Sequence, residues 1–141
     1  MAGYEEAKHI QIGIADRRFA IPIAEVVEVI RMQPLTDIPS ADSAVMGVLQ
    51  VRDDIIAVLS LRHLMFLPEC EPSKATRIVL LKGRTETIGL CVDCVYNVVV
   101  FTDIQKGSKL EGEWCETLFR GIGIHDSELV PILKTAERLY S

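Results

Sequence analysis

The segment Cys91-Val92-Asp93-Cys94 has the residue types and spacing that most resemble a reactive site. A Cys-x-x-Cys pair acts as a redox couple where a helix N-terminus lowers a thiol pKa, and as half of a zinc site where a second ligand pair is present. The surrounding residues 87–95 instead favour a strand, on which residues three apart point to opposite faces. Cys70 and Cys115 form no second pair. The pattern therefore favours structural thiols.

Other residues that often take part in catalysis are scattered along the chain. His9, His63 and His125 lie far apart, and none begins a metal-ligand spacing such as HExxH. There is no Gly-x-Ser-x-Gly elbow and no phosphate loop, and Gly121-Ile122-Gly123 lacks the third glycine of a dinucleotide fingerprint. We therefore predict a protein without enzymatic activity that uses no metal or cofactor.

Length, charge and composition narrow the classes of partner. The 141 residues suit one domain, and 49% of them are hydrophobic, which favours a folded core. The net charge of −5 and the small number of aromatic residues, 6% of the chain, argue against nucleic-acid binding. No run of 18 apolar residues and no signal-peptide pattern is present. We expect a cytoplasmic protein without direct membrane insertion.

Short strands are the elements that must position these residues. Isoleucine at every second place predicts a half-buried strand over residues 9–15, and Pro22 places the strand over 19–23 at an edge or ends it there. Short helices are expected over 60–67 and 134–139, a mid-chain linker over 69–76 and a polar loop over 106–113. Further strands are expected over 26–30, 45–51, 55–59, 77–82, 87–95, 98–101, 118–124 and 128–132. Such spacing is typical of small barrels or sandwiches, and its two similar halves suggest a pair of barrels.

The most informative stretch is the hairpin at residues 47–62, with the charged tip Arg52-Asp53-Asp54 between apolar arms. Three further segments accompany it: residues 19–23 with 26–30, residues 38–39 with 45–48, and residues 88–95 with 118–123. In this order and spacing, the four segments resemble the CheW-like family of chemotaxis adaptors over residues 9–140. Each segment alone is a weak signal, whereas four in order are a strong one.

The resemblance implies an all-β fold of two five-stranded, SH3-like β-barrels packed together, with short helices between them and at the C-terminus. It implies a single CheW-like domain over 9–140. Subdomain one would cover about 16–68, and subdomain two about 9–15 plus 77–135, with the terminal helix across the barrels.

The resemblance also implies a function. Family members are non-enzymatic scaffolds that couple the cytoplasmic tips of methyl-accepting chemoreceptors to the regulatory domain of a CheA-type histidine kinase at the inner face of the membrane. The receptor tip binds in a groove between the barrels, and a face of one barrel packs on the kinase. The candidate partner-binding residues are Val26, Glu28, Ile30, Arg52, Asp53 and Arg62.

Alternatives remain open for these residues and for the pathway. Arg52 and Arg62 also suit a solvated tip and an ion pair, and Val26 and Ile30 also suit a core. Asp53 stands where the family's hairpin has a glycine able to adopt positive φ. That departure leaves room for an adaptor of a chemotaxis-like pathway such as type IV pilus motility. A thiol oxidoreductase using Cys91 and Cys94 is the alternative from another class.

Overall fold

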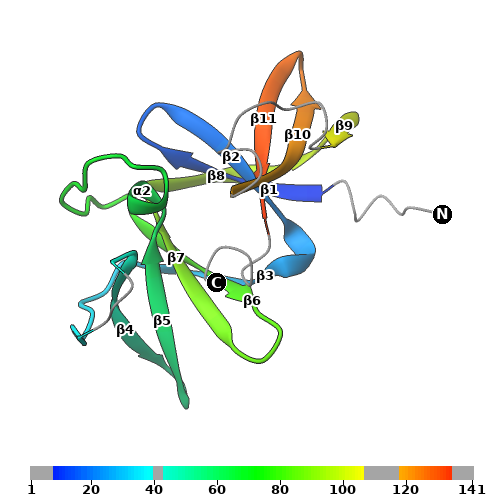
Figure 1. The fold of residues 1–141 in the computed structure, drawn as a ribbon. Helices are drawn as coiled ribbons and strands as arrows, with labels where there is room; N and C mark the ends of the chain where they lie inside the picture. The colour runs from blue at the N-terminus through cyan, green and yellow to red at the C-terminus, as the bar shows by residue number, and fades with distance from the viewer. Residues whose placement is uncertain (1–7, 40–42, 107–117, 135–141) are drawn as a thin grey trace.

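The computed structural model describes residues 8–39, 43–106 and 118–134, and their strands form two sheets that lie side by side (Figure 1). The six-stranded sheet has the order β8-β1-β2-β11-β10-β9. Its strands are β1 (Lys8–Ile14), β2 (Arg17–Pro22), β8 (Cys94–Val100), β9 (Asp103–Lys106), β10 (Phe119–His125) and β11 (Glu128–Leu133). The prediction of an all-β fold is confirmed, although this sheet has six strands rather than five.

The five-stranded sheet has the order β3-β6-β7-β5-β4, so β3 and β4 are its edges. Its strands are β3 (Val26–Arg31), β4 (Val45–Val51), β5 (Asp54–Ser60), β6 (Arg77–Lys82) and β7 (Thr87–Val92). The expected subdomain boundaries are wrong here. β6 and β7, assigned to the second subdomain, pair with β3 and β5, and β2, assigned to the first, pairs with β1. The expected linker over 69–76 is therefore a loop within one sheet.

Two short helical segments lie between strands of the described chain. The 3₁₀ turn η1 (Ile23–Glu25) leads from β2 into β3, and α2 (Leu61–Leu64) follows β5 with Ser60 as its N-cap. The helix predicted over 60–67 is shorter than expected because Phe66 adopts a left-handed φ of +59°, which ends the helix. The terminal helix expected over 134–139 and the loop expected over 106–113 lie almost wholly outside the described residues.

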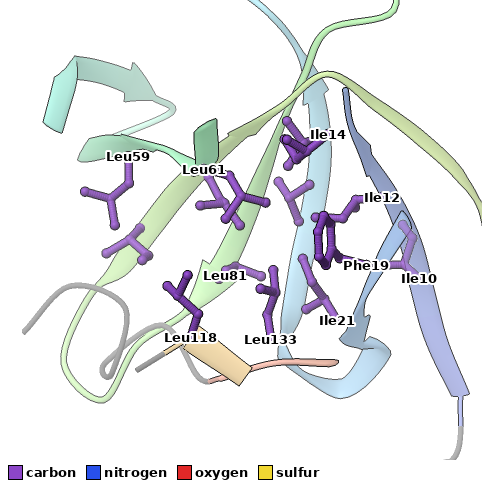
Figure 2. Packing of buried hydrophobic residues seen from close by; sticks show 14 of the residues in the cluster. Ile10, Ile12, Ile14, Phe19, Ile21, Leu59, Leu61, Leu81, Leu118 and Leu133 are labelled. Carbon is purple, nitrogen blue, oxygen red and sulfur yellow. The ribbon is translucent and has the colours of Figure 1, made fainter. Parts of the chain in front are cut away.

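The largest hydrophobic cluster lies between the two sheets (Figure 2). Ile10, Ile12 and Ile14 of β1 contribute one side of it, and Leu59 and Leu81 of the five-stranded sheet contribute another. Each sheet also has a smaller hydrophobic cluster made of its own residues. Alternate residues of β6 pack into two different clusters, so both faces of the strand are buried. This explains its continuous apolar sequence. The two sheets therefore share one hydrophobic core.

β1 differs from its prediction as a half-buried strand, because its other face is covered too. His9 and Gln11 are buried, His9 packs against the ring of Phe101 with centroids 4.8 Å apart, and the Gln11 side-chain amide donates to Asn97 Oδ1 at 3.3 Å. The alternation of apolar and polar residues was correct, but the polar face points into the six-stranded sheet's interior.

Candidate binding surfaces

An apolar groove of about 920 Å³ opens where the segment after α2 meets strands of the six-stranded sheet. β2 forms one wall, β10 and β11 form another, and the chain that leaves α2 completes the lining. The lining residues are Arg17, Arg18, Phe19, Met65, Phe66, Leu67, Leu118, Phe119, Leu129 and Pro131. A concave, mainly apolar surface with a charged border is the usual form of a site for an amphipathic helix.

Two apolar side chains of this groove stand out in solvent. Phe66 is 95% exposed and Leu129 is 66% exposed, whereas Phe19 at the base is buried. Phe66 is held by a Schellman motif: the Leu67 N–H donates to the Arg62 carbonyl at 2.9 Å and the Phe66 N–H donates to the His63 carbonyl at 3.0 Å. The helix end therefore fixes the backbone of Phe66 while its ring faces solvent.

The hairpin tip between β4 and β5 forms a second candidate surface. Arg52 Nη2 lies 2.7 Å from Glu28 Oε1, so this ion pair links the two edge strands of the five-stranded sheet. Arg52, not Asp53, takes the positive φ of the turn, +54°, so the aspartate does not have to adopt a glycine conformation. Arg52 is 71% exposed and Ile55 next to the tip is 65% exposed.

The side chains of β3, which carries the candidates Val26, Glu28 and Ile30, do not alternate regularly between the core and solvent. A β-bulge between Val26 and Glu28 shifts the register, so Val27 is the residue that turns outward. Val26 packs against the cluster between the sheets, and Ile30 packs against the core of the five-stranded sheet. The structure thus brings Glu28, Arg52 and Asp53 to one surface, while Val26 and Ile30 are partly buried against the two clusters.

Arg62 lies away from the hairpin tip and holds the two sheets together. Its Nε donates to Asp93 Oδ1 at 2.9 Å, its Nη2 donates to Asp93 Oδ2 at 2.6 Å, and its Nη1 donates to the Pro68 carbonyl at 2.8 Å. Asp93 also accepts the Ala15 N–H at 2.7 Å, and its own N–H donates to the Gly13 carbonyl. This clamp joins α2, the β7–β8 junction and the β1–β2 turn, so the ion-pair interpretation holds for Arg62.

A second clamp joins η1 to the six-stranded sheet. Arg120 Nη2 donates to both carboxylate oxygens of Glu25, at 2.9 and 2.7 Å, and Arg120 Nε donates to the Leu133 carbonyl at 2.8 Å. A single nitrogen of Arg120 bridges the two oxygens of Glu25, whereas Arg62 places two nitrogens on the two oxygens of Asp93. The two clamps fix how the sheets are oriented, and with them the groove at their junction.

The Arg62–Asp93 clamp should make stability depend on acid pH. The hydrogen bonds from Arg62 hold the pKa of Asp93 below its ordinary value. Because the folded pKa is below the unfolded one, the stabilisation is complete above about pH 4 and is lost as pH falls through the folded pKa. In urea unfolding between pH 6 and 2.5, the stability gap between wild type and Asp93→Asn should shrink below about pH 4. A gap that stays constant would contradict this, and the exposed Asp37→Asn serves as control.

The two cysteines of the Cys-x-x-Cys segment lie on different strands. Cys91 is in β7 of the five-stranded sheet, while Cys94 begins β8 of the six-stranded sheet, so the single strand expected over 87–95 is wrong. Burial raises the pKa of the Cys91 thiol to about 11, which opposes the thiolate that redox chemistry requires. The structural-thiol interpretation is the one that the geometry supports.

Among residues 8–39, 43–106 and 118–134, no group of three or more His, Cys, Asp or Glu side chains is placed to hold a metal ion. None of the helices within these ranges has the length and apolar character needed to cross a membrane.

Two β-sheets packed through a shared core, with a groove at their junction and an exposed hairpin, define an all-β domain whose surfaces suit contacts with other proteins. The chain belongs to the CheW-like domain family, whose model matches residues 8–141.

Its relatives include a probable chemotaxis protein CheW of Rhizobium etli, 25% identical over 94% of this chain and 86% of the relative. The chemotaxis protein CheW of Helicobacter pylori is 27% identical over 89% of this chain and 77% of the relative. The crystal structure of the scaffolding protein TtCheW from Thermoanaerobacter tengcongensis has the same fold, with a TM-score of 0.84 at 23% identity over 94% of this chain and 92% of that one.

Several surface residues were missed by the sequence analysis. Alternation along 54–60 could have identified Ile55, because Ile56 and Val58 point into the core. Val27 adjoins the predicted candidates on β3 but was not chosen among them, and the bulge that turns it outward interrupts the alternation there. Phe66 was assigned to the helix predicted over 60–67, so its position after the helix end was not foreseen. Asp93 was part of a segment that resembles the family, but it was not among the candidate site residues.

Proposed function

We propose that this protein is a non-enzymatic adaptor of a chemotaxis signalling complex, which couples receptor cytoplasmic tips to a CheA-type histidine kinase. Membership of the CheW-like family supports the scaffold class, and the curated relatives carry chemotaxis names. The observation that carries the proposal is the presence of two separate exposed apolar surfaces on one rigid domain. An adaptor needs two such surfaces because it must hold two partners at once.

The groove at the sheet junction is the proposed receptor site. A receptor tip is a bundle of helices, and an α-helix with its side chains is about 10–12 Å across. Leu129 and Phe66 offer exposed apolar contacts at the groove border, and Phe19 offers a buried base. An amphipathic helix would bury these side chains against its own apolar stripe.

The hairpin tip is the proposed kinase site. Val27 and Ile55 are exposed apolar residues that directly adjoin Glu28 and the tip. The Arg52–Glu28 pair supplies charge next to these apolar side chains. Interfaces with an apolar centre and charged border are typical of regulated protein complexes. This surface lies on the five-stranded sheet, so a partner bound there leaves the groove open.

A matched pair of substitutions tests the two-surface proposal. Leu129 and Ile55 are equally exposed, so Leu129→Arg and Ile55→Arg should each leave the unfolding temperature close to wild type. We expect Leu129→Arg to weaken binding to a receptor cytoplasmic fragment at least tenfold without changing kinase binding. Ile55→Arg should do the reverse, as measured by calorimetric titration of each partner.

The controls of this experiment are internal, because each variant serves as the folded control for the other. Wild-type protein that binds neither a receptor fragment nor a CheA-like regulatory domain would overturn the adaptor proposal. Equal loss of both partners from either single variant would contradict the assignment of two independent surfaces. Measurable thiol–disulfide exchange activity at Cys91 and Cys94 would favour the alternative function instead.

A further inference from the structure

We infer that Phe66 is the specificity anchor of the groove, and that its occupant is an amphipathic helix whose apolar stripe is bordered by acidic residues. This inference rests on the proposed receptor site and names the residue and the partner chemistry that would select for it. The observation behind it is an aromatic residue in a backbone position that disfavours it, with its ring left in solvent.

Phe66 is the residue whose left-handed backbone ends α2. The Schellman motif requires a left-handed residue at this position, and glycine is the residue that adopts it without steric penalty. A bulky residue with positive φ is an outlier that is held in place by its surroundings. Phe66 is 95% exposed, so its ring gains almost no packing within this chain that offsets the strain. Such strain is found most often at binding sites.

The position of Phe66 gives the ring a binding role. Phe66 lines the groove together with Leu129 and Phe19, which come from strands far away in sequence. An aromatic side chain covers a large contact area with only two rotatable bonds, and such residues dominate the binding energy of interfaces. A helix laid into the groove would therefore bury Phe66 among its own aliphatic side chains.

The charges at the groove border define the other half of the occupant. Arg17 and Arg18 both line the groove and are exposed, although the chain as a whole has a net charge of −5. The Arg18 guanidinium lies 4.1 Å from the centroid of the Tyr96 ring, a cation–π contact that restrains it beside the groove. Carboxylates next to the apolar stripe of the helix would complement this basic border.

Three substitutions of Phe66 distinguish the contribution of the aromatic ring to binding from the effect of the left-handed backbone on stability. Against a receptor cytoplasmic fragment, Phe66→Gly and Phe66→Ala should both weaken affinity about 30-fold, because both remove the anchor. Phe66→Trp should stay within about threefold of wild type, because it restores an aromatic ring. In thermal unfolding, Phe66→Gly should raise Tm by about 2–4 °C through relief of the left-handed strain, whereas Phe66→Ala should not.

The role of the basic border is tested with the variant Arg17→Glu, whose binding to the same receptor fragment is measured at several salt concentrations. Wild-type affinity should fall as salt rises, and this slope should be smaller in Arg17→Glu, whose affinity at low salt should be about tenfold weaker. Binding by Phe66→Gly equal to wild type would overturn the anchor while leaving the adaptor proposal intact. A fall in the Tm of Phe66→Gly would show that the ring serves packing and would overturn it too. Failure of wild type to bind receptor fragments would overturn both proposals.

Discussion

Replacement of Asp93 by alanine is expected to lower the free energy of unfolding by about 2–3 kcal/mol. The substitution removes two hydrogen bonds to Arg62 and one to the Ala15 N–H, and it leaves a mostly covered guanidinium without its counter-ion. Breaking a buried pair costs about 3–5 kcal/mol, and the partial exposure of both partners, 18% and 27%, lowers that figure. Urea unfolding at pH 7 measures the loss.

The control for Asp93 is the exposed ion pair at the hairpin. Arg52→Ala removes an ion pair of 2.7 Å, close to the 2.6 Å of Arg62–Asp93, from a solvated position, and it should change stability by less than about 1 kcal/mol. A double-mutant cycle of Arg62→Ala with Asp93→Ala should give a coupling energy of at least about 1 kcal/mol. Additive effects of the two substitutions would contradict the clamp.

Replacement of Ile12 by alanine should cost about 3–4 kcal/mol, the second large effect. Ile12 has no exposed surface and lies in the cluster between the sheets, so truncation leaves a cavity that both sheets border (Figure 2). Because this core is shared, both sheets should lose stability together. Hydrogen exchange should show lower protection in β6 and β7 as well as in β1.

A matched substitution makes the Ile12 result interpretable. Val130→Ala removes buried carbon from the six-stranded sheet's own cluster, which does not include the five-stranded sheet. A loss of protection confined to the six-stranded sheet in Ile12→Ala would show that the sheets unfold separately. That outcome would contradict the single rigid domain on which two-partner scaffolding depends.

Much of this fold followed from the sequence because its strands carry clear local signals. Isoleucine at every second place identified β1, and Pro22 marked the end of β2. The pairing of strands could not be obtained in this way. β6 has apolar residues on both faces, so nothing in its sequence says which neighbours it joins, and the assignment to the second subdomain failed at that point.

The candidate site was predictable where geometry is local and not where it depends on distant contacts. The hairpin tip and its charges were identified, yet the partner of Arg62 is Asp93, 31 residues away. That pairing depends on the strand arrangement at the β7–β8 junction. Likewise, the bulge that turns Val27 outward and the helix end that exposes Phe66 are set by contacts with β6 and by the α2 backbone. Alternation and helical spacing carry no signal for either.

Simultaneous binding of two partners is the central claim, and a sedimentation experiment tests it directly. Vesicles that carry receptor cytoplasmic fragments are mixed with a CheA-type kinase, with and without this protein, and the pelleted kinase is measured. We expect the kinase to sediment at least several-fold more with wild-type protein than without it. Leu129→Arg and Ile55→Arg should each abolish that gain. Kinase recruitment that is the same with and without the protein would contradict the account.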